Sequence, residues 1–296
     1  MATERFGRLL TAMVTPMRQD GSVDYAAAQE LAVRLVESGS DGVVVCGTTG
    51  ESPTLSDDEK IGMFKAVVDA IGGRSAVVAG TGSNDTRHSI ELTKVAEKTG
   101  VDAILAVVPY YNRPPQEGLF RHFEAIAKST SLPVILYNIP GRTGQNLAPE
   151  TTARLAAIEN VVALKDSSGS LDHVSQVRRL AGPDFLIYSG DDSLTLPILA
   201  VGGAGVVSVA SHLVGRRIRD MIEAFMAGKV ELAQRIHLEM FALFKALFVT
   251  TNPIPVKKAL QLAGINTGPL RPPLVEATES ETRLIRQAMM ELGLIG

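Results

Sequence analysis

The chain has 296 residues, of which 45% are hydrophobic and 21% are charged, a composition typical of a globular protein with one large domain or two ordinary ones. Its net charge is -3 and its 29 lysines and arginines are scattered, so we expect no binding to nucleic acid. No apolar run approaches the ~18 residues of a membrane helix, and the first residues do not have the pattern of a signal peptide. The single cysteine, Cys46, excludes an internal disulfide and lies in an apolar run, where we expect it to be buried. These features predict a cytoplasmic protein that does not bind membranes.

Short apolar segments recur eight times between residues 9 and 228, each followed by a loop and then by an amphipathic helical segment. Their starts lie 20 to 34 residues apart, the spacing of strand-plus-helix units, and their continuous apolarity predicts strands that are buried on both faces. We expect these strands at residues 9–17, 42–47, 76–82, 103–109, 133–139, 161–167, 185–191 and 205–211. A capping box of Ser56 and Glu59 predicts a helix start before residues 61–71, and Pro149 predicts another before residues 151–158.

Eight such units favour a closed barrel, because closure removes both edges of a parallel sheet. No GxGxxG motif follows the first segment, which disfavours an open dinucleotide-binding sheet. After residue 228 only helical segments remain, at 230–249, 255–263 and 279–292, with a linker rich in Gly and Pro at 266–273. We therefore predict an α/β protein with a (β/α)8 TIM barrel as its catalytic domain, residues 1–228, and a C-terminal helical domain, residues 229–296.

One lysine, Lys165, stands at the end of an apolar predicted strand. The other nine lysines lie in predicted helices or at their edges, where we expect the ammonium groups to reach water. Burial disfavours the charged form of a lysine, and a neutral amine is a nucleophile towards carbonyl carbon. The alternative is a structural lysine that pairs with Asp166 or Glu51. The stretch around Lys165 leaves both interpretations open.

Further polar residues follow the predicted strands at their carboxyl ends, where barrel enzymes have their active sites. The backbone of residues 47–52 forms either a cradle for a carboxylate or only a tight turn, and the tyrosines at 110–111 are either functional or a packed rim. Tyr137 ends the strand beside that of Lys165, so its phenol can reach a carbonyl carbon bound to the lysine. Arg142 is either a surface charge or a clamp for a carboxylate. The five histidines lack ligand spacing, so we expect no metal.

Six motifs together resemble the dihydrodipicolinate synthase family, which belongs with N-acetylneuraminate lyase to the pyruvate-dependent class I aldolases. The motifs are GTTGE (47–51), PYYNRP (109–114), YNIPGRTG (137–144), LKDSSG (164–169), SGDD (189–192) and NPIPVK (252–257). They follow one another in the family's order over essentially the whole chain. The resemblance implies a barrel with a C-terminal helical domain, and a lyase of the diaminopimelate route to lysine that needs no cofactor.

The resemblance also assigns roles to individual residues. Those implied in catalysis are Lys165, Tyr137, Thr48 and Tyr111, and those implied in substrate binding are Thr48, Thr49, Arg142 and Val207. Lys165 would form a Schiff base with pyruvate, and the enamine would attack L-aspartate 4-semialdehyde. Tyr137 and Thr48 would relay protons together with Tyr111 of the partner subunit, so the resemblance implies a homo-oligomer, usually a tetramer. Backbone N–H groups of Thr48 and Thr49 would hold the pyruvate carboxylate.

Two alternatives to the synthase remain. The intact PGRTG loop around Arg142 favours a substrate with a small α-amino carboxylate, whereas a sugar-acid lyase needs groups that bind hydroxyls there. Another Schiff-base 2-keto-acid aldolase or lyase of the same superfamily is the first alternative. A catalytically silent regulatory barrel is the second, although Lys165 and Tyr137 are both present.

We expect weak or absent feedback inhibition by L-lysine, the end product that regulates some members of the family. The resemblance places the lysine pocket at Ser52, Asp57, Lys60, Asn84, His88 and Tyr110. Lysine-sensitive members of the enterobacterial type have a glutamate where this chain has His88 and a histidine where it has Lys60. The ligand's ammonium groups therefore lose a carboxylate and meet a fixed positive charge. Asp57 is the residue that could supply a carboxylate instead.

Overall fold

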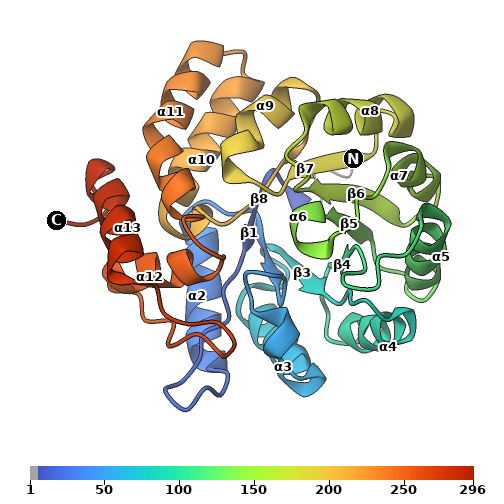
Figure 1. Cartoon of the computed structure of the whole chain (residues 1–296), viewed down its shortest axis with the longest axis horizontal. Coiled ribbons are helices and arrows are strands. Elements are labelled where there is room, and N and C mark those ends of the chain that lie inside the picture. Colours follow the sequence, from blue (N-terminus) through green and yellow to red (C-terminus); the bar gives the residue numbers. More distant parts are fainter. Residues whose placement is uncertain (1–5) are drawn as a thin grey trace.

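The computed structural model describes residues 6–296 of the chain, and within them eight parallel strands close into a barrel (Figure 1). The strands are β1 (Leu9–Ala12), β2 (Gly42–Val45), β3 (Ala76–Gly80), β4 (Ala103–Val107), β5 (Val134–Asn138), β6 (Val161–Asp166), β7 (Leu186–Ser189) and β8 (Gly205–Ser208). Each strand pairs with the next along the chain, and β8 pairs with β1. The predicted TIM barrel is confirmed.

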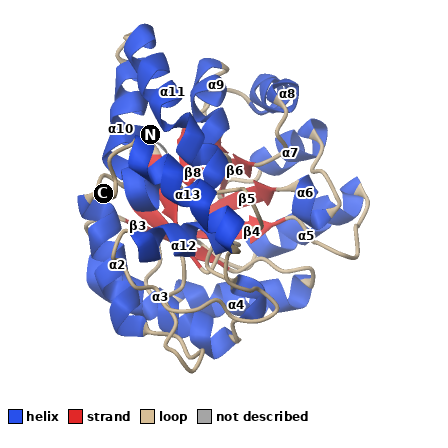
Figure 2. Ribbon diagram, turned by 60° about the vertical axis from the view of Figure 1, so that its left-hand side comes forward, coloured by secondary structure: helices blue, strands red, loops and turns tan. Residues whose placement is uncertain are grey.

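Helices surround the strands and alternate with them along the sequence (Figure 2). They are α2 (Tyr25–Glu37), α3 (Asp57–Ile71), α4 (Thr86–Glu97), α5 (Gln116–Ala127), α7 (Pro149–Ala156), α8 (Leu171–Ala181), α9 (Thr195–Ala200) and α10 (Ser211–Met226), with the short elements η1 (Ser52–Thr54), α6 (Pro140–Thr143) and η2 (Asp192–Leu194) in three loops. The predicted capping box of Ser56 and Glu59 is present at the start of α3. Pro149 opens α7, as expected of a proline in the first turn.

Every strand lies within its predicted segment, but most end earlier than the apolar pattern does. After β1, for example, Met13, Val14 and Met17 are buried although they lie beyond the last residue of the strand. Burial of a loop at the barrel mouth gives it the same apolar composition as a strand. The pattern therefore predicts where each strand begins better than where it ends.

A C-terminal helical region follows the barrel and packs beside α10 (Figure 1). Its helices are α11 (Val230–Ala246), α12 (Ile254–Leu262) and α13 (Glu279–Glu291); α11 ends three residues before its predicted bound, and the ends of α12 and α13 lie within one residue of theirs. The helix α13 packs against both α11 and α12. Among residues 6–296, no helix combines the length and the apolarity needed to cross a membrane.

Candidate active site

Lys165 and Tyr137 meet inside the barrel. They lie directly opposite each other in the pairing of β5 with β6. Both are buried, with 5% of Lys165 and 4% of Tyr137 exposed. The Nζ atom of Lys165 lies 4.1 Å from the centroid of the Tyr137 ring, close enough for the π face to stabilise a cation. The structure thus brings together the two residues that the sequence suggested for imine chemistry.

The two carboxylates considered as structural partners of Lys165 are engaged elsewhere. Asp166 accepts hydrogen bonds from the backbone N and the hydroxyl of Ser168, at 3.1 and 2.6 Å. Glu51 forms an ion pair with Lys257, with Oε1 2.6 Å from Nζ. Within residues 6–296, Lys165 forms no ion pair with either carboxylate. The ion pairs expected of a purely structural Lys165 are therefore not formed among residues 6–296.

The loop after β2 leaves two backbone donors free. Its turn is closed by hydrogen bonds from the N–H groups of Gly50 and Ser52 to the Gly47 carbonyl, at 3.1 and 3.3 Å. The N–H groups of Thr48 and Thr49 have no acceptor among residues 6–296. Adjacent free N–H groups at a turn form a concave site for an anion. The arrangement suits a small carboxylate.

Asn252, which precedes α12, connects two loops of the barrel mouth. Its amide Nδ2 donates to Thr49 Oγ1 at 2.9 Å, and its carbonyl oxygen accepts from Arg142 Nη2 at 2.9 Å. Arg142 belongs to the short helix α6 and is exposed. Asn252 is therefore a bridge from the C-terminal region to the loops that carry Thr49 and Arg142. Its motif was recognised from the sequence, but its position between these loops was not.

A buried ion pair reinforces the same connection. Lys257 on α12 is 4% exposed and Glu51 is 2% exposed. Besides Glu51, Lys257 Nζ contacts the Pro269 carbonyl at 2.9 Å. Burial lowers the pKa of Lys257, and the neighbouring Glu51 carboxylate opposes this shift. The expectation that all nine other lysines reach water was therefore wrong for Lys257, and also for Lys60, which is 8% exposed.

A second buried carboxylate fixes the end of β8. Asp192 accepts hydrogen bonds from the backbone N atoms of Val209 and Ala210, at 3.0 and 2.9 Å, and from the Ser208 hydroxyl. Burial raises the pKa of Asp192, whereas these hydrogen bonds lower it. Val207 immediately precedes this segment and is 1% exposed. Asp192 thus fixes the backbone beside the Val207 carbonyl.

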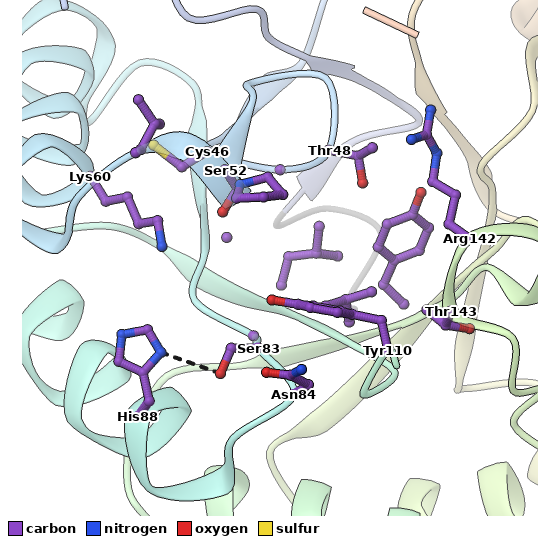
Figure 3. A pocket seen from close by; sticks show the side chains of 18 of the residues that line it. Cys46, Thr48, Ser52, Lys60, Ser83, Asn84, His88, Tyr110, Arg142 and Thr143 are labelled. Carbon is purple, nitrogen blue, oxygen red and sulfur yellow. Dashed lines mark hydrogen bonds between the residues drawn. The ribbon is translucent and has the colours of Figure 1, made fainter. Parts of the chain in front are cut away.

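A cavity of about 550 Å³ opens at this end of the barrel. Thr48, Tyr137 and Arg142 line one part of it, whereas Lys165, which contacts the Tyr137 ring, does not line it. Figure 3 shows Thr48 and Arg142 at one end, Lys60 and His88 at the other, and Tyr110 between them. All six positions expected to form an L-lysine pocket belong to this cavity.

The charged groups at the far end of the cavity already contact one another. Asp57 lies 2.8 Å from His88 Nε2 and 3.7 Å from Lys60 Nζ. His88 Nδ1 also lies 3.3 Å from the Ser83 hydroxyl, the contact drawn in Figure 3. Asp57 therefore has two partners from its own chain. A cationic ligand would have to compete with both.

Cys46 lines the same cavity and is fully buried. Burial raises the pKa of its thiol to about 12, so the thiol stays protonated at neutral pH. The prediction of a small buried hydrophobic residue is confirmed. Its backbone has φ of 54°, which starts the sharp turn into the loop of Thr48 and Thr49.

Known proteins resemble the chain over almost its whole length. The model of the dihydrodipicolinate synthetase family matches residues 5–292. The chain is 58% identical to the 4-hydroxy-tetrahydrodipicolinate synthase of Desulforudis audaxviator over 293 residues, 99% of this chain and 100% of that protein. It is 60% identical to that of Heliobacterium modesticaldum over 289 residues, 98% of this chain and 96% of that protein.

Solved structures show the same similarity over almost the whole chain. The crystal structure described as dihydrodipicolinate synthase from Cyanidioschyzon merolae with lysine bound has a TM-score of 0.97 and 52% identity, and the match covers 98% of this chain and 99% of that one. A structure of the same enzyme from Aquifex aeolicus has a TM-score of 0.95 and 41% identity, with 98% and 99% covered. The resemblance based on six motifs is confirmed: the chain belongs to the dihydrodipicolinate synthetase family.

Proposed function

We propose that this chain condenses pyruvate with L-aspartate 4-semialdehyde through a Schiff base on Lys165, the reaction of a 4-hydroxy-tetrahydrodipicolinate synthase. The observation that carries this proposal is the Lys165 amine, buried against the Tyr137 ring and without a carboxylate partner among residues 6–296. An amine without a charged partner in a poorly solvated site is suited to attack a ketone. Membership of the family and the names of its full-length relatives support the same reaction.

Pyruvate binds with its carboxylate at the free N–H groups of Thr48 and Thr49. This position directs the ketone carbon into the barrel, towards Lys165. The amine adds to that carbon, water leaves, and the protonated imine makes the adjacent methyl group acidic. Loss of a methyl proton gives the enamine, which is the carbon nucleophile.

Tyr137 transfers protons in these steps, because its ring already contacts the amine. A phenol with a reference pKa near 10 needs a relay to exchange protons quickly. Thr48 lines the same part of the cavity and has no hydrogen-bond partner for its hydroxyl among residues 6–296. The third member of the relay is Tyr111 of the partner subunit.

The conformation of Tyr111 supports its action across subunits. Tyr111 is 91% exposed and its backbone has φ of 72°, a left-handed conformation that is costly for a bulky residue. A second subunit that buries this side chain would explain why the chain holds an aromatic residue outside its own barrel at such a cost. The active form is therefore at least a dimer. The resemblance to the family implies a tetramer that acts in the cytoplasm.

Arg142 binds the carboxylate of the semialdehyde. One arm of its guanidinium group is fixed to the Asn252 carbonyl, and its other N–H donors are without an acceptor among residues 6–296, at the edge of the cavity that Arg142 lines. The Val207 carbonyl, beside the segment fixed by Asp192, completes the site. A sugar-acid substrate has no second carboxylate at this position, so Arg142 favours the semialdehyde.

Borohydride reduction in the presence of pyruvate tests this function, because it converts an imine into a stable amine on the lysine that formed it. Peptide mapping should find the adduct on Lys165, and Lys165→Ala should abolish it. Lys60→Ala is the matched control, since Lys60 is also buried and lines the cavity that Thr48, Tyr137 and Arg142 line. An adduct on another lysine would refute the assignment. Trapping without turnover of the semialdehyde would favour another 2-keto-acid aldolase.

A further inference from the structure

The hydroxyl of Ser167, two residues after Lys165, is buried and has no hydrogen-bond partner among residues 6–296. Buried hydroxyl groups are nearly always paired, because an unpaired one loses its bonds to water without replacement. The backbone N of Ser167 donates to the Asn138 carbonyl at 2.8 Å, which extends the pairing of β5 and β6 by one residue. Since side chains alternate along a strand, Ser167 lies on the same face as Lys165, and Asp166 lies on the other.

Ser167 Oγ and Lys165 border one small space. Gly190 lies over the end of β6, with its N–H bonded to the Asp166 carbonyl at 2.7 Å. A Cβ atom at Gly190 would collide with Ser167 Oγ and would lie 3.2 Å from Lys165 Cε. The absence of a side chain at Gly190 thus allows the hydroxyl and the end of the lysine side chain to share this space.

The next serine has the opposite environment. The Ser168 hydroxyl donates to Asp166 Oδ1 at 2.6 Å and accepts from the backbone N of Ser170 at 3.2 Å. Its contacts therefore stabilise the loop after β6. Ser167 makes no such contact, so local structure does not explain its hydroxyl.

We propose that Ser167 is a catalytic residue of the first half-reaction, whose hydroxyl hydrogen-bonds to the oxygen of the ketone carbon that becomes attached to Lys165. This inference rests on the function proposed above. The ketone carbon that becomes bound to Nζ lies two bonds beyond the Cε atom that borders the space of Ser167, and its oxygen lies three bonds beyond. The ketone oxygen of pyruvate, or the hydroxyl of the carbinolamine formed from it, comes within reach of Ser167 Oγ there.

The step assisted by Ser167 is the formation and dehydration of the carbinolamine. The Nζ lone pair forms a bond to the ketone carbon while the carbonyl π electrons move to the oxygen, which takes up a proton as Nζ releases one. The carbinolamine then loses this oxygen as water when the C=N bond forms: the proton that completes the water comes from the Tyr137 relay, and Nζ keeps its remaining proton, so that the product is the protonated imine. A hydrogen bond from Ser167 stabilises the negative charge that develops on oxygen during addition. Enamine attack on the aldehyde occurs at another carbon and does not require it.

Ser167→Ala and Ser168→Ala form a matched pair with opposite expectations. Loss of an unpaired buried hydroxyl should leave Tm unchanged or slightly raised in Ser167→Ala, whereas Ser168→Ala should lower it by roughly 2–4 °C through the lost bond to Asp166. The rate of borohydride trapping with pyruvate should fall ~10-fold or more in Ser167→Ala, the effect of one hydrogen bond to a developing charge, and should change little in Ser168→Ala. Both variants are smaller than the native residue, so neither can overfill its site.

Steady-state kinetics supply the second readout, since the two substrates react in successive half-reactions. In Ser167→Ala, kcat/KM for pyruvate should fall while kcat/KM for the semialdehyde stays unchanged. Trapping at the wild-type rate, an equal loss for both substrates, or a lowered Tm would each overturn the role of Ser167. Absence of any adduct on the wild-type protein would instead refute the Schiff-base function itself, and this inference with it.

Discussion

Replacing Lys257 by Met tests how strongly the C-terminal region supports the loop after β2, which carries Thr48, Thr49 and Glu51. Lys257 on α12 and Glu51 in the loop after β2 form an ion pair in which the side chains are 4% and 1% exposed. Methionine retains the length and apolar volume of the lysine stem but cannot neutralise Glu51. The substitution therefore leaves a buried carboxylate with its Oε1 unpaired, while Oε2 keeps the bond from the backbone N of Arg271 at 2.9 Å.

The expected cost is large because the partner charge stays buried. Removing one member of a buried pair typically destabilises a protein by ~3–5 kcal/mol. At ~2–4 °C per kcal/mol for a domain of this size, Tm should fall by roughly 6–20 °C. Because Glu51 lies two residues after Thr49 in the same loop, the rate of pyruvate trapping should fall as well.

Lys258→Met is the matched control, one residue along the same helix. Lys258 is 18% exposed and lies 3.8 Å from Glu276, which is 59% exposed, so its loss should cost at most ~1 kcal/mol. Thermal unfolding of both variants at one protein concentration measures the contrast. In the double variant Lys257→Met with Glu51→Gln the uncompensated charge is absent, and part of the stability should return. If Lys257→Met lowers Tm no more than Lys258→Met does, the ion pair does not stabilise the fold and the reasoning fails.

Three further substitutions or ligands test the site. Tyr137→Phe should lower turnover by roughly 10²-fold or more with little change in Tm, because the phenyl ring fills the same space but cannot transfer a proton. Turnover above a tenth of the wild-type value would contradict the proton relay. Arg142→Ala should raise KM for the semialdehyde far more than KM for pyruvate, as initial rates with each substrate varied will test; equal effects would count against a carboxylate clamp. L-Lysine should inhibit weakly or not at all, because Asp57 is already paired with His88 and Lys60. Strong inhibition at low L-lysine that His88→Ala relieves would contradict this prediction.

The sequence by itself determined the barrel and the burial of Lys165 at a strand end, because both depend on local patterns. Apolar segments at regular intervals specify strands covered on both faces, and the box of Ser56 and Glu59 specifies where α3 begins. The apolar residues before Lys165 were enough to predict its burial, and strand adjacency was enough to place Tyr137 beside it. These features need only neighbours in sequence or in strand order.

Only the tertiary structure decided which side chains support the site from far along the chain. Asn252 and Lys257 come from the C-terminal region, about 200 residues after the loop of Thr49 and Glu51 that they contact. The sequence pattern around Lys257 is that of a helix with an exposed lysine. It does not show which residues pack against that face of α12. The unpaired hydroxyl of Ser167 could not be predicted from the sequence either. Whether a hydroxyl has a hydrogen-bond partner depends on all the residues that surround it in space. Long-range packing, which local propensity does not encode, decides such contacts.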